Sequence, residues 1–151
     1  MTEASTSWIE YPTKLDEIVR RNRERFEVGL ATAAEQAAIT GDVDTRATPR
    51  DTIKTWHLIA LRDRTLGQTT VHVLGRVHRD VDWITSYVAV LAPDRSRVRT
   101  KNSLYRLGPE GHGEPGLALI FLVAAALRRW GLDQHYDLGV IPVRPDWAPP
   151  P

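Results

Sequence analysis

Residues 83–107 have the sequence WITSYVAVLAPDRSRVRTKNSLYRL, in which β-branched and aromatic residues lie on both sides of a turn signal. Proline at the second position and aspartate at the third position favour a type I turn, and Pro93 and Asp94 of the segment Pro93-Asp94-Arg95-Ser96 suit these two positions. This stretch predicts a β-hairpin with strands over Trp83–Ala92 and Arg97–Leu107, the second of them broken near Asn102-Ser103.

The β-rich composition extends upstream of this hairpin to Ile53. Turn-forming residues recur at 63–67 and at 80–82, and they separate two further predicted strands, Ile53–Arg62 and Thr69–Arg79. Residues 53–107 are therefore predicted to form an antiparallel meander of four to five strands, a small curved sheet.

Two helices are predicted to flank this sheet. Apolar residues recur at spacings of three and four from Leu15 to Ala37, which predicts a long amphipathic helix over residues 14–39 with Thr13 as its N-cap. A run of apolar residues over 117–127 lies between Pro115 and Gly131, which predicts a buried helix over residues 115–130 that ends in a left-handed glycine. The expected fold is α+β, with residues 1–151 in one domain.

The remaining segments carry little periodicity. Residues 40–52 are predicted to be a linker, residues 137–143 a short edge strand, and the proline-rich residues 144–151 an extended tail. The apolar run of residues 117–127 is shorter than the roughly 20 residues that cross a bilayer, and residues 1–10 lack the pattern of a signal peptide. We therefore expect a cytoplasmic protein without a membrane partner.

The formal net charge of +1 conceals a strong asymmetry along the chain. Residues 54–106 contain ten basic and four acidic residues, a net charge of +6, so the rest of the chain carries −5. Arg97, Arg99 and Lys101 alternate along one predicted strand and so share a face, and an earlier strand places His72, Arg76 and His78 in the same way. The predicted ligand-binding residues are Arg97, Arg99, Lys101, Arg76, His72, His78, Tyr87, Tyr105 and Arg106.

A basic face of this kind attracts anions. The first hypothesis is a non-enzymatic protein that binds nucleic acid or a nucleotide, with Tyr87 or Tyr105 stacking on a base. A second reading is a solvated face whose arginines pair with acidic residues of the chain or protect a strand edge. A third is a protein–protein interaction module or inhibitor, in which the arginines meet the acidic surface of a host protein.

Signals for an enzyme are weaker. The chain has no cysteine, which excludes thiolate nucleophiles and cysteine-ligated metal sites. His57, His72 and His78 lie on predicted β segments and are the basis of a weaker alternative, a histidine-based enzyme, but no carboxylate stands at a ligand-like spacing from them. The glycine-rich loop 108–116 contains no paired base and nucleophile, so we predict no catalytic residue, no metal and no cofactor.

Large apolar side chains surround the helix predicted over 115–130. A second copy of the chain would cover the part that the sheet and one helix leave open, so a homo-oligomer is expected, while the alternative is that the remaining elements of one chain cover it.

The segments Ile84–Val88 and Val98–Gly108 resemble hairpins of small accessory proteins of phages and plasmids. This resemblance covers about 25 residues. It implies a protein that acts by binding a nucleic acid, a nucleotide signal or a host protein.

Overall fold

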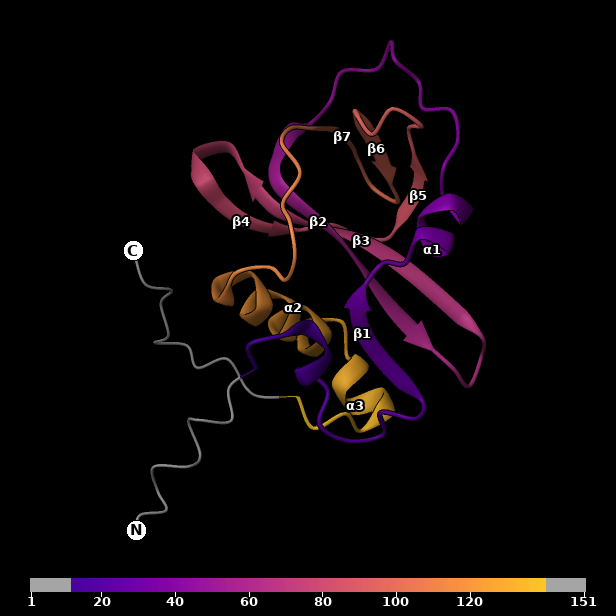
Figure 1. Ribbon diagram of the computed structural model, residues 1–151, viewed down its shortest axis with the longest axis vertical. Coiled ribbons are helices and arrows are strands. Elements are labelled where there is room, and N and C mark those ends of the chain that lie inside the picture. The colour runs from indigo at the N-terminus through magenta and orange to yellow at the C-terminus, as the bar shows by residue number, and fades with distance from the viewer. Residues whose placement is uncertain (1–11, 141–151) are drawn as a thin grey trace.

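The computed structural model describes residues 12–140 and shows an α+β fold, in which short helices flank a seven-stranded mixed sheet (Figure 1). The strands are β1 (Phe26–Leu30), β2 (Asp51–Asp63), β3 (Gln68–Val77), β4 (Val81–Ile84), β5 (Val88–Leu91), β6 (Arg97–Thr100) and β7 (Leu104–Leu107). The α-helices are α1 (Ala33–Ala38), α2 (Leu117–Arg129) and α3 (Leu132–Tyr136), and the short 3-10 helices are η2 (Leu15–Glu17) and η3 (His78–Asp80).

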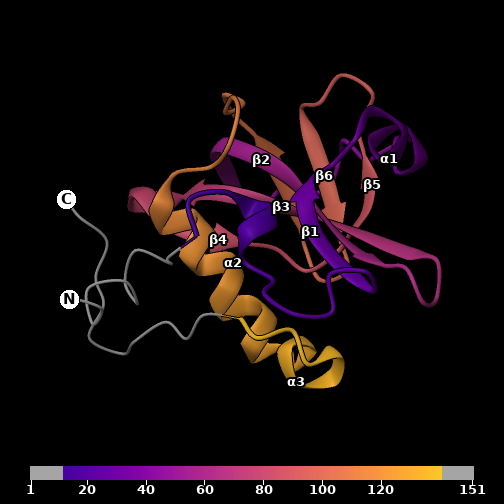
Figure 2. The same ribbon diagram turned by 60° about the horizontal axis from the view of Figure 1, so that its bottom comes forward.

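The long strand β2 connects the two halves of the sheet, whose strand order is β4-β3-β2-β7-β6-β5. Its first three residues pair in parallel with β7, and its last five pair in antiparallel fashion with β1. Between these parts the pairing with β3 shifts register from Lys54 to His57, and Thr55 has a positive φ of 48°. Such a bulge bends a strand. The β5–β6–β7 strands therefore lie on one side of the central strands and α2 on the other (Figures 1 and 2).

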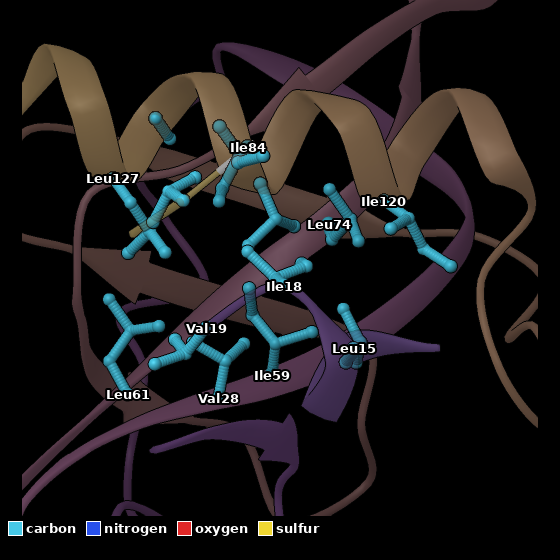
Figure 3. Packing of buried hydrophobic residues seen from close by; sticks show 14 of the residues in the cluster. Leu15, Ile18, Val19, Val28, Ile59, Leu61, Leu74, Ile84, Ile120 and Leu127 are labelled. Carbon is cyan, nitrogen blue, oxygen red and sulfur yellow. The ribbon is translucent and has the colours of Figure 1, made fainter. Parts of the chain in front are cut away.

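Two hydrophobic clusters lie on opposite sides of β2 and β3, because successive side chains of a strand point to opposite faces. One cluster joins Ile59 and Leu74 to η2, β1 and the buried side of α2, including Ile120 and Leu127 (Figure 3). The other joins β2 and β3 to the inward side chains of β5, β6 and β7: Ile53, Trp56, Leu58, Val71, Val73, Val77, Val88, Leu91, Val98, Tyr105 and Leu107. The second cluster fixes the position of the predicted basic hairpin.

The long helix predicted over residues 14–39 is wrong. This segment contains η2, β1 and α1, and it turns at Asn22, which has a φ of 57°. Phe26 and Val28 also fit a two-residue alternation, and as a strand they are buried while the backbone pairs with residues 59–63 of β2. Pairing with a strand more than 25 residues away thus determines the structure of this segment, although its local apolar spacing favours a helix.

The sheet region follows the prediction with two corrections. β2 and β3 match the two earlier predicted strands to within two residues, and the predicted break near Asn102-Ser103 separates β6 from β7. The predicted strand Trp83–Ala92 is instead divided into β4, which pairs with β3, and β5, which pairs with β6. The sheet is also not wholly antiparallel, because β7 returns beside the start of β2 in the parallel direction.

The local predictions around the hairpin and the last long helix are confirmed. The Arg95 N–H donates to the Ala92 carbonyl at 2.9 Å and closes the turn between β5 and β6. Helix α2 occupies residues 117–129, and Gly131 after it has the left-handed conformation, with a φ of 76°.

The predicted linker over 40–52 is irregular as far as Arg50, and β2 begins at Asp51. Residues 137–140 form no strand, and the rest of the predicted edge strand over 137–143 and the tail over 144–151 lie outside the described residues. No helix in the described range 12–140 is long and apolar enough to span a membrane.

Candidate functional site

The β5–β6–β7 strands have an inner face, which belongs to the second hydrophobic cluster, and an outer face, which carries basic residues. On β6, Val98 and Thr100 point inward and are buried, so Arg97 and Arg99 point outward. Arg106 of β7 lies directly opposite Arg97 in the antiparallel register. These three arginines therefore share the outer face.

Lys101 and Tyr87 extend the outer face beyond the ends of β6 and β5. The Lys101 N–H donates to the Tyr87 carbonyl at 3.0 Å, so the two residues are neighbours across the strands. Both side chains are exposed, and 43% of Tyr87 is accessible to solvent. Because alternate residues of a strand are spaced by about 6.6 Å, Arg97, Arg99 and Lys101 form a row about 13 Å long.

The charges of the outer face are not neutralised by carboxylates in the part of the chain that the structure describes. Within residues 12–140, none of Arg97, Arg99, Lys101 and Arg106 makes a salt bridge. Four other basic residues of the β region are paired there: Arg62 with Glu27 and Glu35, Arg64 with Glu27, Arg76 with Asp82, and Arg95 with Glu110. Of the six basic residues of the β region without a salt bridge in the described range, four thus lie on the outer face, and Lys54 and Arg79 are the other two.

Residues 41–50, the strap, cross this face from β5 to β7. The Gly41 N–H donates to the Leu91 carbonyl at 2.9 Å, and the Arg50 N–H donates to the Leu104 carbonyl at 2.7 Å. Between these anchors, the Arg97 guanidinium donates to the Ala47 carbonyl at 3.1 Å. Arg97 and Arg99 are half-buried, whereas Lys101 and Arg106 are exposed.

A hollow of about 310 Å³ lies between the strap and the tip of the β5–β6 hairpin. Asp42 and Asp94 line it together with Arg97. Hydrogen bonds from Ser96, and to a smaller degree the charge of Arg97, lower the pKa of Asp94, so this carboxylate is ionised at neutral pH. The two aspartates make the hollow itself less suited to an anion than the open part of the face.

Tyr105 and His72 were predicted to bind ligand, but both are buried away from the outer face. Tyr105 points into the second cluster, where its hydroxyl accepts hydrogen bonds from Trp83 Nε1 at 3.1 Å and from Arg50 at 3.4 Å. The ring of His72 stacks on Trp130 with 5.1 Å between ring centroids. Neither side chain is available to a ligand on the outer face.

Arg76 and His78 also lie elsewhere. Arg76 is on β3 and pairs with Asp82 of β4 at 3.5 Å, and His78 is an exposed residue of η3 whose backbone N–H donates to Asp51. Of the nine predicted residues, the structure brings together five: Arg97, Arg99, Lys101, Arg106 and Tyr87.

The three histidines of the alternative enzyme hypothesis do not assemble into a metal site. Within residues 12–140 no group of three or more His, Cys, Asp or Glu side chains is arranged to hold a metal ion. His57 lies against the loop 108–116, His72 beneath Trp130, and His78 on η3.

A second polar feature, which the sequence did not predict, surrounds His57. A cavity of about 250 Å³ is lined by residues from β2, α1 and its approach, and the loop 108–116: Leu30, Ala31, Gln36, His57, Leu58, Glu110, Gly111, His112 and Gly113. The Gly111 N–H donates to the Trp56 carbonyl at 2.9 Å, which holds the loop against β2. A Cβ atom at Gly111 would lie 2.5 Å from His57 Nε2, so only glycine lets the loop backbone pass over the ring.

Arg95, at the tip of the hairpin, binds two residues that line this cavity. Its guanidinium donates to Glu110 at 2.8 Å and to the Gln36 side-chain oxygen at 2.8 Å, and it lies 5.1 Å from the centre of the Trp56 ring. The glycine-rich composition of the loop was the only sequence signal here, because the other groups come from distant segments.

The chain matches no known protein family. Comparison with curated proteins and with solved structures also finds no match. The function must therefore be inferred from the side chains and their geometry.

Proposed function

We propose that this chain is a non-enzymatic binding protein for single-stranded nucleic acid and that it uses the outer face of β5, β6 and β7. The observation that supports this proposal best is the cross-strand pair of Arg97 and Arg106, continued by Arg99 on β6 and by Lys101 directly after it. Like charges directly opposite each other destabilise a sheet. A polyanion that binds both arginines would remove this repulsion.

The shape of the charged row favours a linear ligand. Its charges are spread over about 13 Å of strand and would meet several phosphates in succession. A compact anion would contact only one or two of them. The exposed ring of Tyr87 lies next to Lys101 at the end of the row, where a base can stack on it.

The strap determines which basic residues of the outer face are open to nucleic acid first. Arg97 donates to the neutral carbonyl of Ala47, whereas a phosphate oxygen is a charged acceptor and makes a stronger hydrogen bond. Nucleic acid therefore competes with the strap for Arg97. Arg106 and Lys101 are open to it from the start.

The test is fluorescence anisotropy with a labelled single-stranded oligonucleotide at salt concentrations from about 50 to 200 mM. Affinity should fall steeply as salt rises. The double variant Arg97→Gln/Arg106→Gln removes two phosphate contacts, so the slope of log affinity against log salt should fall by about 1.4. Tyr87→Ala should weaken binding by about 1–3 kcal/mol, the range for one stacked base.

The matched control is Arg64→Gln/Arg76→Gln, which removes the same charge from arginines that pair with Glu27 and Asp82. It should change the slope much less. The proposal fails if no oligonucleotide binds at low salt, or if the two double variants weaken binding equally. In the first case, an acidic protein surface becomes the better candidate for the partner of this face.

A further inference from the structure

The cavity beside His57 lies near the tip of the β5–β6 hairpin. Arg95, which binds two of its lining residues, is two residues before Arg97, and its partner Gln36 belongs to α1, which lies beside β5 (Figure 2). The hairpin that carries the charged row therefore also borders this cavity. At about 30 Å³ for each water-sized group, 250 Å³ holds about eight such groups, the size of a pyrimidine base.

His57 contributes a polar atom to the cavity. The residue is only 7% exposed, and this burial lowers the pKa of its imidazole, partly opposed by hydrogen bonding to the Gly113 backbone. The ring is then neutral at pH 7, and a neutral ring has one donor and one acceptor nitrogen. His57 lines the cavity, and its Nε2 lies under the backbone of Gly111, where an added Cβ would be 2.5 Å away.

Glu110 contributes a carboxylate that is held in position. Arg95 binds Glu110 Oε2 at 2.8 Å, while Glu110 Oε1 is 3.4 Å from Arg95 Nε. Each carboxylate oxygen has two lone pairs, so both retain the capacity to accept a further hydrogen bond. The side chains of Leu30 and Leu58 supply apolar surface.

These groups select for a ligand that donates hydrogen bonds. In the described part of the chain no Lys or Arg lines the cavity, and the neighbouring Arg95 is already paired with Glu110 and Gln36, so the cavity does not favour a phosphate. The acceptor that remains available is the Glu110 carboxylate. An acidic side chain recognises cytosine by accepting from its exocyclic amino group.

We infer that this cavity binds one unpaired nucleobase with an exocyclic amino group, and that cytosine fits it best. The inference rests on the proposed function, since the unpaired base belongs to a single strand that the outer face binds. The amino group of the base donates to Glu110, and the ring lies against Leu30 and Leu58. Thymine and uracil place a carbonyl oxygen where cytosine has its amino group, and this oxygen repels the carboxylate.

The experiment compares oligo-dC with oligo-dT of equal length, about twelve nucleotides, at one salt concentration by fluorescence anisotropy. Oligo-dC should bind about tenfold more tightly, within the range for one good base contact. Glu110→Gln should abolish this preference and leave the dependence on salt unchanged. Glu27→Gln is the matched control, because Glu27 also pairs with arginines but lies on β1, and it should keep the preference.

A second measurement does not depend on any variant being folded. NMR titration of the unmodified protein with 1-methylcytosine should shift the ring protons of His57, and 1-methylthymine should not. Two results would overturn the base site and leave the proposed function standing. One is equal affinity for the two oligonucleotides, with affinity that still falls as salt rises. The other is a preference for oligo-dC that persists in Glu110→Gln. Absence of binding to either oligonucleotide overturns the proposed function itself, and the free-base titration then decides the cavity alone.

Discussion

His72 lies on β3 with both ring nitrogens engaged by the protein. Nδ1 is 2.9 Å from the Thr85 carbonyl, Nε2 is 2.9 Å from Thr70 Oγ1, and Trp130 covers the ring. Burial lowers the pKa of this imidazole. At the scale of single residues, a histidine whose two ring nitrogens both have hydrogen-bond partners has a structural role, whereas the ring of His57 lines a cavity.

We predict that stability falls between pH 7.5 and pH 5.5, because the unfolded chain protonates His72 and His57 near the ordinary pKa of 6.5 while the folded chain resists protonation. Each histidine contributes at most about 1.4 kcal/mol per pH unit. Urea unfolding at several pH values measures this slope. His72→Gln and His57→Gln should each reduce it, and a slope that persists in the double variant would refute the assignment.

At the scale of elements, α1 shows how six residues without a buried side chain can form a helix. The Thr32 hydroxyl accepts from the Glu35 N–H at 3.1 Å, and the Glu35 carboxylate accepts from the Thr32 N–H at 2.8 Å. Arg62 of β2 also donates to Glu35 at 2.7 Å and lowers the pKa of this carboxyl to about 2. The helix is thereby joined to the sheet, and it positions both Gln36 and the start of the strap.

Glu35→Ala should therefore destabilise the protein by about 1–3 kcal/mol, since it removes half of the capping box and leaves Arg62 with fewer acceptors. The measurement is the free energy of unfolding in urea. Glu24→Ala, in the exposed turn before β1, is the control and should change it by less than about 0.5 kcal/mol. Equal effects of the two variants would show that the Glu35 network does not hold α1.

At the scale of the whole molecule, α2 closes one side of the sheet. Leu119, Ile120, Phe121, Val123 and Leu127 are all buried by the described part of a single chain. One chain thus covers most of the apolar helix that led us to expect a homo-oligomer. That oligomer stays a prediction, and Leu117 and Trp130, at the two ends of α2, are the large apolar side chains still exposed there.

Leu127→Ala should cost about 2–5 kcal/mol of stability, because it leaves a cavity where α2 packs on β1 and β2. Leu117→Ala, at a side chain that is 42% exposed, should cost much less. Urea unfolding curves compare the two variants. Similar midpoints for both would mean that α2 does not close the main core.

The sequence determined the features whose causes lie between near neighbours. The turn at 93–96, helix α2, the left-handed Gly131 and the extents of β2 and β3 follow from preferred backbone angles, from local periodicity and from helix ends. The row of Arg97, Arg99 and Lys101 on the outer face follows in the same way, because alternation along a strand is a local property.

Only the tertiary structure decided the features that depend on distant partners. Phe26–Leu30 forms a strand because β2 pairs with it, and β7 runs parallel to the first three residues of β2, a partner that is remote in sequence. Arg62 forms an ion pair with Glu35, and Arg95 forms one with Glu110. Arg97 and Arg106 instead lie directly opposite each other in the sheet. Strand pairing and charge neutralisation act between groups that are adjacent in space and remote in sequence, so no local sequence pattern predicts them.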